Sequence, residues 1–348
     1  MTGVTRANGV LVDARAARVF PSATAEVGSG AAALWSDAIG TLKFGESADV
    51  TLQTPYDLAS LTKVVATTTI AMQLVDQQSL TLGAHVGDFF PEWTGADRAP
   101  ATVRDLLEHS SGLPARLVDP PPTTVREFVH DICAIPLEYQ VGTGSIYSDL
   151  GFILLGFVLE KVGRASLSAQ FSRIWPDRDL AFELDRDRQR SAAPTLPMDN
   201  DPRRGRTLVG EVHDNYAAAL DGHAGHAGLF GTVGAVGAFA RAVLRAARGG
   251  RSEAAPFSPG RVKEFITRSS VAGSSRALGW DTMLPSSSCG TRMSASAFGH
   301  VGFTGTSLWI DPERDRYFVL LTNRVCGGGS IDAMRDVRRA FHDALGDI

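Results

Sequence analysis

The sequence predicts an α+β protein in which both ends of the chain build one antiparallel sheet and the middle folds mainly into helices. Short apolar runs separated by turn residues occupy the first part, and apolar residues at helical spacing dominate the middle. Near the C-terminus, two apolar runs are joined by a tight turn. We therefore expect an α/β domain with an antiparallel sheet, flanked by helices, from residues 1–58 and 225–348. Residues 59–224 are expected to form a mostly helical domain, with the active site between the two.

In the first part of the chain we expect three short strands and then a helix. The strands fall at Glu26–Val27, Ala31–Trp35 and Gly40–Phe44, where apolar residues lie between turn-forming ones. The helix runs from Ser60 to about Gln78, because its apolar side chains recur every three or four residues.

The middle segment has clear helix start signals. Thr102–Asp105 and Thr124–Glu127 are capping boxes, in which a threonine and an acidic residue satisfy the first free N–H groups of a helix. A further helix is expected from Ser148 to about Val162. Two more, at Ala235–Ala247 and Pro259–Thr267, follow toward the C-terminus.

The last part of the sequence predicts a hairpin and a final helix. Strands at Ser307–Ile310 and Tyr317–Thr322 are joined by the turn Asp311–Arg314, and a helix at Ile331–Leu345 closes the chain. Strands, then helices, then strands and a helix again is the order expected of an α+β domain that holds an inserted helical unit.

Composition argues against several classes of protein. The formal net charge is -4, with no basic stripe, so we expect no nucleic-acid partner. No apolar run reaches the length of a membrane span, so none is expected. The N-terminal residues lack a charged region followed by an apolar one, which favours a cytoplasmic protein, or a periplasmic one if a signal has been removed. The oligomeric state is left open.

No metal or cofactor is expected either. The cysteines lie far apart and in no metal-ligand spacing, so we expect free thiols. They are Cys133, Cys289 and Cys326. His223 and His226 have a ligand-like spacing, but the glycines around them favour a loop over a rigid helical pair. No nucleotide-binding glycine motif occurs in the chain.

The tetrapeptide Ser60–Lys63 opens the first predicted helix and places a hydroxyl and an amine three residues apart. Residues at this spacing share a helix face, so the Lys63 amine can reach the Ser60 oxygen and assist it as a nucleophile. The chain has only four lysines against 30 arginines, and lysine, unlike arginine, can give up its proton. The alternative is an ordinary helix start, with Ser60 as the cap and Lys63 on the surface.

Two later stretches could complete such a site. Tyr147-Ser148-Asp149 lies where a loop enters a helix, and His300-Val301-Gly302 leads toward a strand. The order Ser-x-x-Lys, Tyr-Ser-Asp, His-x-Gly resembles the three motifs of the serine β-lactamase superfamily. This superfamily includes class C β-lactamases, DD-peptidases of the penicillin-binding type, and related esterases. Further stretches resemble it in the same order: Tyr56–Lys63, Leu106–Pro114, Tyr147–Gly151 and Ala224–Phe230.

The resemblance implies a β-lactamase/transpeptidase-like fold and a role for each matched residue. Ser60 would be the nucleophile, and Lys63 and Tyr147 would share the general-base and general-acid work. The backbone N–H groups of Ser60 and Phe303 would form the oxyanion hole. The helix N-terminus at Ser60 and the burial of Lys63 should both favour loss of the lysine's proton.

Three residues depart from the family pattern and bear on the substrate, which they would contact together with Gly302. Asp149 stands where many relatives have asparagine, and an ionised carboxylate cannot donate to an amide carbonyl and should repel it unless paired. His300 stands for a common lysine and is at most partly charged, so it should hold a substrate carboxylate less firmly. Val301 lacks the hydroxyl of the threonine often found there.

These departures favour a serine hydrolase that acts on small, uncharged acyl esters through an acyl-enzyme on Ser60. One alternative is a β-lactamase or a D-Ala-D-Ala-type peptidase that uses the same residues, and its substrate would be a β-lactam or a peptide. A second alternative is a catalytically silent homologue that binds a ligand, although such a protein has no need of Ser60, Lys63 and Tyr147 together.

Overall fold

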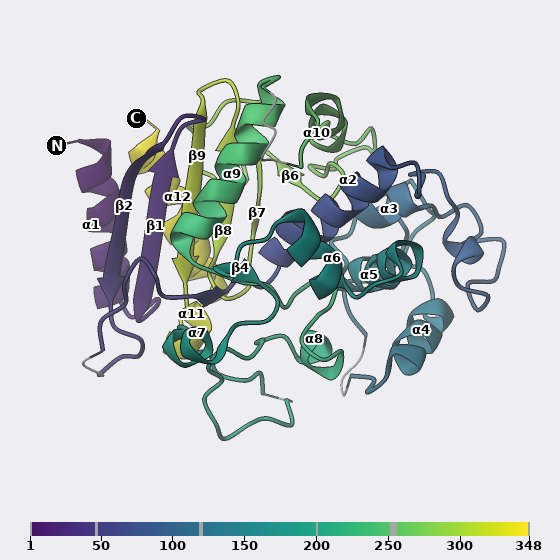
Figure 1. Ribbon diagram of the computed structural model, residues 1–348, viewed down its shortest axis with the longest axis horizontal. Helices are drawn as coiled ribbons and strands as arrows, with labels where there is room; N and C mark the ends of the chain where they lie inside the picture. The colour runs from purple at the N-terminus through teal and green to yellow at the C-terminus, as the bar shows by residue number, and fades with distance from the viewer. Residues whose placement is uncertain (1, 46–47, 118–120, 200, 251–255, 347–348) are drawn as a thin grey trace.

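A six-stranded antiparallel sheet covered by helices on both faces forms one side of the molecule in the computed structural model (Figure 1). The structure describes residues 2–45, 48–117, 121–199, 201–250 and 256–346. The strand order is β2-β1-β9-β8-β7-β6, so strands from the start of the chain pair with one from its end. The strands are β1 (Ser22–Gly28), β2 (Ala33–Gly40), β6 (Asp281–Thr282), β7 (Phe298–Val301), β8 (Ser307–Asp311) and β9 (Arg316–Thr322). This arrangement confirms the α+β class.

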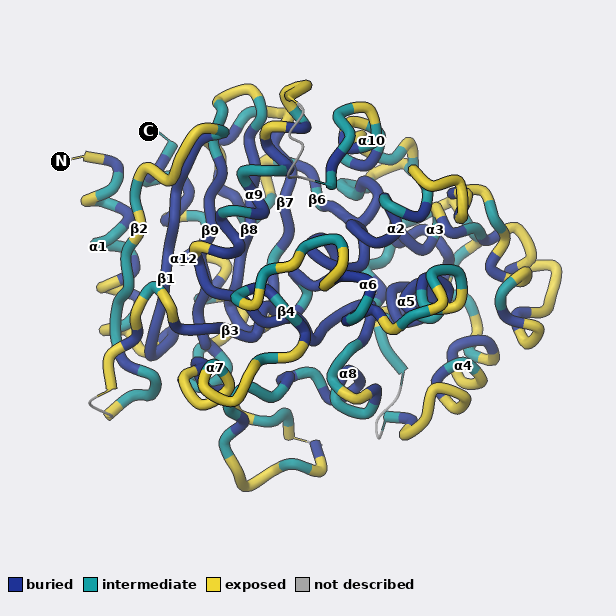
Figure 2. Tube along the Cα trace, in the orientation of Figure 1, coloured by how far each residue is buried: buried dark blue, intermediate teal, exposed yellow. Residues whose placement is uncertain are grey.

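The central strands of the sheet are buried on both faces. Successive side chains of a strand point to opposite sides, so neighbouring residues of one strand enter two different cores. On β9, Phe318 and Leu320 pack with α1 (Gly3–Ala16) and α12 (Ile331–Leu345), while Val319 and Leu321 belong to the core that includes α9 (Val233–Ala247). In Figure 2 the central strands are accordingly dark blue along their length. The expected hairpin, the turn between its strands and the final helix are all present.

Three features of this half differ from the sequence-based expectation. Helix α1 lies where neither a helix nor a strand was expected, because most of its buried residues are too small to give a clear apolar stripe. They are Gly3, Ala7, Leu11 and Ala14. One strand, β2, takes the place of the first of the two strands expected at Ala31–Trp35 and Gly40–Phe44; the second is absent, since β2 ends at Gly40 and Thr41 forms only an isolated bridge with Asp49. Strand β7, which carries His300, was not expected because it is only four residues long.

The other side of the molecule is mostly helical (Figure 1). Both capping boxes are present, with Thr102 and Thr124 each accepting a hydrogen bond from the N–H three residues later. The helices here are η2 (Val86–Asp88), α3 (Val103–Leu107), α4 (Val125–Ala134), α5 (Asp149–Gly163), α6 (Leu167–Ile174) and α8 (Asn215–Ala219), while α7 (Arg186–Ser191) lies below the strands of the large sheet in Figure 1. A small sheet of β3 (Tyr56–Asp57), β5 (Phe230–Gly231) and β4 (Leu180–Ala181) joins three distant segments. Helices α10 (Pro259–Phe265) and α11 (Arg324–Gly327) complete the structure.

The helix expected from Ser60 to Gln78 is present but not uniform. After a turn at Ser60 it continues as a π-helical segment, η1 (Lys63–Thr67), and then as α2 (Thr68–Asp76). Segments of π-helix are rare and often lie at functional sites. Here the segment has a tertiary bond as well, since the Thr67 hydroxyl donates to the carbonyl of Gly225 at 2.6 Å.

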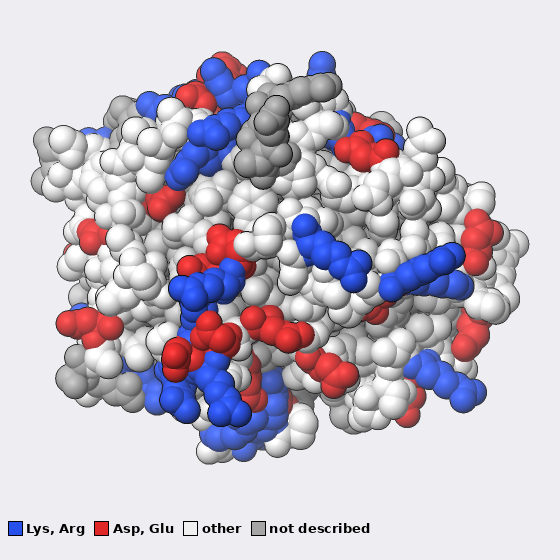
Figure 3. Space-filling view, in the orientation of Figure 1, with Lys and Arg blue, Asp and Glu red and all other residues white. Residues whose placement is uncertain are grey.

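The charged side chains on one face of the molecule and the length of its helices can be compared with the sequence. Basic and acidic side chains lie interspersed on the face seen in Figure 3. Among the described residues, no helix combines the length and the apolarity that a bilayer span requires. The described residues include all three cysteines, and no disulfide joins any of them, as the sequence predicts.

Truncation of Phe341 should test the packing of α12 on the sheet. This side chain is fully buried against the sheet, so Phe341→Ala should lower the free energy of unfolding by about 3–5 kcal/mol. Urea denaturation of this variant, beside the exposed-site control Asp336→Ala, measures the effect. Equal midpoints for both variants would contradict the packing described here.

Candidate active site

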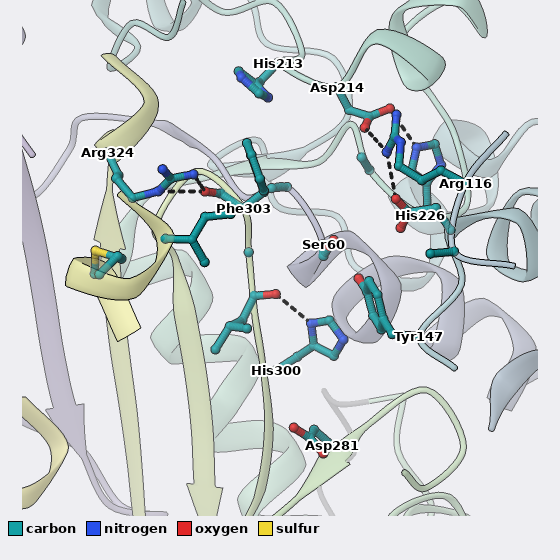
Figure 4. A pocket seen from close by; sticks show the side chains of 18 of the residues that line it. Ser60, Arg116, Tyr147, His213, Asp214, His226, Asp281, His300, Phe303 and Arg324 are labelled. Carbon is teal, nitrogen blue, oxygen red and sulfur yellow. Dashed lines mark hydrogen bonds and ion pairs between the residues drawn. The ribbon is translucent and has the colours of Figure 1, made fainter. Parts of the chain in front are cut away.

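Ser60 lies just before the helix formed by η1 and α2, directly after a residue with unusual backbone geometry. Ala59 has a φ of +47°, a conformation that non-glycine residues adopt rarely and at some energetic cost. The buried Asp57 carboxylate stabilises this bend by accepting from the N–H of Ala59 at 2.7 Å and from the N–H of His213 at 2.6 Å. The fold thus holds Ser60 in a fixed position at the edge of a cavity (Figure 4).

Lys63 is fully buried and has an acceptor for each of its three N–H bonds. Its Nζ lies 3.1 Å from Ser60 Oγ, 2.8 Å from Asp149 Oδ1 and 3.1 Å from the carbonyl oxygen of His226. The alternative of an ordinary surface lysine is therefore wrong. A carboxylate and a carbonyl can only accept and a hydroxyl can also do so, so these contacts suit an ammonium group that donates all three bonds.

The expectation that Lys63 loses its proton easily is contradicted by its surroundings. Burial by itself lowers the pKa of Lys63, but Asp149 and then Tyr147 outweigh it, so the pKa lies above its ordinary value of 10.5. The sequence suggests burial and a helix N-terminus, which both lower the pKa of Lys63. It does not show the contact with the Asp149 carboxylate, which raises this pKa.

Asp149 is paired on both oxygens rather than free to repel a substrate. Oδ1 accepts from Lys63, and Oδ2 accepts from Arg116 Nη1 at 2.8 Å. Burial by itself raises the pKa of Asp149, but Lys63, and after it the other basic neighbours, hold the pKa below its ordinary value. Asp149 is therefore ionised at neutral pH.

Tyr147 lies beside Ser60 with its hydroxyl unoccupied. Among the described residues this hydroxyl has no hydrogen-bond partner, although Lys63 and Ser60 are near enough to influence its pKa. Burial raises that pKa, so Tyr147 is a neutral phenol at pH 7. Its ring packs 4.7 Å from the ring of His109 and 5.7 Å from that of His300.

His300 and Val301 lie at the end of β7, and the loop 302–306 that follows faces Ser60. Burial, with the charges of Arg276 and Lys63, lowers the pKa of His300 well below 6.5, so the ring is neutral. Since Nδ1 lies 2.9 Å from the Val301 carbonyl, Nδ1 carries the proton and Nε2 is a buried acceptor without a partner among the described residues. His300 thus cannot supply the positive charge that a lysine would.

The loop 302–306 is held by two buried guanidinium groups. Arg338 donates to the carbonyls of Gly302 and Thr306 at 2.7 and 2.9 Å, and Arg324 donates to the carbonyl of Phe303 at 2.6 Å. A Cβ atom on Gly302 would lie 2.6 Å from the carbonyl oxygen of Leu58, so only glycine fits there. These contacts set the loop close to the segment that precedes Ser60.

Two threonine hydroxyls join the loop to that segment directly. Thr304 donates to the carbonyl of Asp57 at 2.8 Å, and Thr306 donates to that of Leu58 at 3.0 Å. Within the described chain, the backbone N–H groups of Ser60 and Phe303 have no acceptor. Both groups are therefore free to donate to a substrate oxygen, as an oxyanion hole requires.

The cavity beside Ser60 has a volume of about 430 Å³, within the usual range for a small-molecule site. One end is charged and contains Arg116, Asp149 and Asp214; Arg276 and Asp281 line the part near His300. The large apolar lining residues are Met198, Val301, Phe303, Ile331 and Met334, and Arg324 lies against the ring of Phe303 (Figure 4).

Asp149, Asp214 and His226 are close enough to bind a metal ion, with potential ligand atoms within 4.8 Å of one another. However, Arg116 Nη1 already lies 2.8 Å from Asp149 and 3.0 Å from Asp214. An ion bound to both carboxylates would have to displace this guanidinium. The group therefore fits an ion-pair network better than a metal centre.

Sequence reasoning missed four residues of the site: Arg116, Asp214, Arg276 and, as a neighbour of Asp214, His226. None belongs to a recognisable catalytic motif, and the first two are 98 residues apart in the chain. His226 lies in one of the family-like stretches and was considered only as a metal ligand. Arg116, Asp214 and Arg276 lie outside the stretches that resemble the family, so their charge was the only available signal.

Comparison with known proteins agrees with this architecture. The β-lactamase family model matches residues 8–341. An N-acetylmuramyl-L-alanine amidase of Bacillus subtilis (strain 168) is 29% identical over 306 residues, covering 78% of this chain and 68% of the relative. A protein of Escherichia coli (strain K12), provisionally named D-alanyl-D-alanine carboxypeptidase, is 31% identical over 327 residues, covering 82% of this chain and 72% of the relative.

Solved structures show the same fold at lower identity. EstCE1, described as a hydrolase with promiscuous acyltransferase activity, superposes with a TM-score of 0.78 at 19% identity, covering 99% of this chain and 98% of its own. A class C β-lactamase from Rhodobacter sphaeroides gives 0.75 at 17% identity, with 98% of each chain covered. By its match to the family across nearly all of its length, this chain belongs to the β-lactamase family of serine hydrolases.

Proposed function

We propose that this protein is a carboxylesterase that cleaves small acyl esters through an acyl-enzyme on Ser60. The observation that carries the proposal is the position of the Lys63 ammonium, 3.1 Å from Ser60 Oγ and 2.8 Å from Asp149. It supports a nucleophile whose proton must leave by way of Tyr147. A binding protein without activity has no use for such an arrangement.

In the acylation step, Ser60 Oγ attacks the ester carbonyl while Lys63 donates a hydrogen bond to the same oxygen. Because that bond uses one Ser60 lone pair, the serine proton must go to another acceptor, and we assign this role to the Tyr147 oxygen, which has no other partner among the described residues. Tyr147 accepts this proton and passes its own to the departing alkoxide, so the relay needs no free base. The N–H groups of Ser60 and Phe303 stabilise the negative charge that develops on the carbonyl oxygen.

Deacylation reverses the relay with water in place of the alcohol. Water gives its proton to Tyr147 as it attacks the acyl-enzyme, and Tyr147 returns a proton to Ser60 Oγ as the acid leaves. Lys63 stays charged throughout and keeps the serine oxygen in place.

The charge on Asp149 supports esters over β-lactams and peptides. Both of its oxygens already accept from cations, and an ionised carboxylate has no N–H with which to hold an amide carbonyl. A small ester presents no such amide, so it loses nothing at this position.

The apolar lining residues of the cavity support an ester with an apolar substituent. Phe303 and Ile331 are 48% and 57% exposed although large and apolar, and both line this cavity. Met198 and Met334 line it too, and methionine adapts readily to apolar ligands of different shape.

A peptidase that recognises a free carboxylate is the second candidate, and Arg276 is the observation that favours it. Its guanidinium lies 5.0 Å from the ring centre of Tyr147, and within the described parts of the chain it has no ion pair. By contrast, Arg116, Arg324 and Arg338 are each bound to carboxylates or carbonyls. Arg276 could thus supply a charge that His300 cannot.

Replacement of Ser60 should abolish the reaction. Ser60→Ala should reduce kcat for short-chain p-nitrophenyl esters by about 10⁴- to 10⁶-fold, because no acyl-enzyme can form. Intact-mass measurement after treatment with a fluorophosphonate should show one adduct in the native protein and none in the variant. Ester cleavage that survives in Ser60→Ala would overturn the proposal.

Replacement of Asp149 should change the substrate preference. Asp149→Asn supplies an amide donor that can hold an amide carbonyl, so β-lactam turnover should rise relative to ester turnover by about 10-fold. The same change removes the carboxylate that raises the pKa of Lys63, which acts on both kinds of substrate. A chromogenic cephalosporin, a D-Ala-D-Ala peptide and p-nitrophenyl acetate would be compared in both proteins. An unchanged ratio, or a native protein that prefers the cephalosporin or the peptide, would refute the ester assignment.

Shortening of an apolar side chain at the cavity mouth should test the apolar substituent. Ile331→Ser should lower kcat/KM for octanoyl relative to acetyl esters, or for phenyl relative to methyl esters, by about 10-fold. The matched control is Leu34→Ser, since Leu34 is 51% exposed and does not line the cavity. Equal selectivity in the two variants would show that this wall does not contact the substrate.

A further inference from the structure

One guanidinium joins the two buried carboxylates at the charged end of the cavity (Figure 4). Arg116 Nη1 lies 2.8 Å from Asp149 Oδ2 and 3.0 Å from Asp214 Oδ2, and its Nη2 donates to Asn215 Oδ1 at 2.8 Å. The guanidinium carbon of Arg116, Cζ, also lies over the Tyr216 ring, 3.9 Å from its centre. Arg116 is thus fixed on four sides.

Asp214 is fixed equally well on its other oxygen. Its Oδ1 lies 2.8 Å from His226 Nε2 and accepts from the N–H of Ala217 at 2.8 Å, as the cap of helix α8. His226 is 1% exposed, and its backbone carbonyl is one of the three acceptors of Lys63. The contacts therefore form a closed ring. It runs from Lys63 through Asp149, Arg116 and Asp214 to His226, and the carbonyl of His226 contacts Lys63 again.

We propose that Arg116 is a positioning residue of this active site: it holds the Asp149 carboxylate turned toward Lys63, while Asp214 and His226 keep Arg116 in place. The inference rests on the proposed acyl-enzyme function of Ser60. It assigns to three residues outside the matched motifs the task of keeping Lys63 charged and aimed at the nucleophile. Arg116 acts through Asp149 and does not itself touch the reacting atoms.

The charges around Asp149 explain why the guanidinium is needed. Three of the groups that face Asp149 are Lys63 from η1, Arg116 from the loop between α3 and α4, and Asp214 from the start of α8. The others are His226, from the loop after α8, and the neighbouring Tyr147. Without the guanidinium, the two carboxylates would lie within 4.8 Å of each other with no bridge between them. Like charges at such a distance raise the pKa of one of the pair.

The sign of the pH effect follows from this. The pKa of Asp149 is held below 3.8, so the ionised form that binds Lys63 persists down to low pH in the native protein. The active form is lost as the pH falls through this pKa. Removing Arg116 raises the pKa of Asp149, so activity should be lost at a higher pH than in the native protein.

The pH profile of kcat for a short-chain p-nitrophenyl ester provides the test. Arg116→Met should move the acid limb to higher pH by about one pH unit or more, and Arg116→Gln should do the same. Arg116→Lys keeps a positive charge, so its acid limb should move less. Arg241→Met is the matched control: its guanidinium also pairs with a carboxylate, that of Glu26, and stacks on a tyrosine ring, but it does not line the cavity. An acid limb that stays in place in both neutral variants would overturn the inference.

A double variant separates positioning through Asp149 from a general structural effect. In the Asp149→Asn background the carboxylate through which Arg116 acts on Lys63 is absent, although Asp214 remains, so Arg116→Met should leave the acid limb of the remaining activity unmoved. A limb that moves as far as in the native background would show that Arg116 does not act through Asp149. Circular dichroism and thermal melting establish that each variant is folded, and the Gln and Lys variants serve if the Met variant is not.

Failure of this inference can be told apart from failure of the proposed function. If the native protein forms no fluorophosphonate adduct at Ser60, the proposed function fails and the inference falls with it. If the adduct forms but the acid limbs of the native protein and Arg116→Met coincide, only the inference fails.

Discussion

The bond network of the buried Lys63 ammonium is the interaction on which the rest of the site depends. A charged lysine with no exposed surface is stable only because three acceptors surround it. They come from the turn before η1, from the start of α5 and from the loop after α8, which are far apart in the sequence. The same contacts that stabilise the charge therefore bring together the segments that form the cavity.

The charge on Lys63 also decides how the chemistry is divided. Because its pKa is raised, Lys63 orients the Ser60 oxygen and does not act as a base, which leaves proton transfer to the Tyr147 phenol. The partner that keeps Lys63 charged, Asp149, is also the residue that disfavours amide substrates. Activation of the nucleophile and selection of the substrate are thus two consequences of one carboxylate.

Sequence patterns predicted those parts of the protein that rest on local signals. The capping box at Thr102 and the amphipathic helix Ile331–Leu345 are defined by a few neighbouring residues, and the structure has both. The contact between Lys63 and Ser60 follows from helical spacing alone. Helix α1 could not be predicted in this way, because small residues make up most of its buried face.

The charge state of the site could not be predicted, since it depends on contacts between distant segments. Arg116 is 33 residues from Asp149 and 98 from Asp214, and neither separation has a local pattern. Considering burial without these partners gave the wrong direction for the pKa of Lys63. The residues matched to the family motifs thus indicate the reaction, while unmatched residues set the protonation of the group that orients the nucleophile.

The protonation of Lys63 can be measured directly, because the chain contains only four lysines. Titration of protein labelled with ¹³C at lysine Cε, followed by NMR and assigned with Lys63→Arg, reports the charge of each. We expect the Lys63 signal to show a protonated amine up to and beyond pH 10.5, the ordinary pKa of lysine. A Lys63 signal that titrates near neutral pH would show a free amine that acts as the base, and would contradict the central claim.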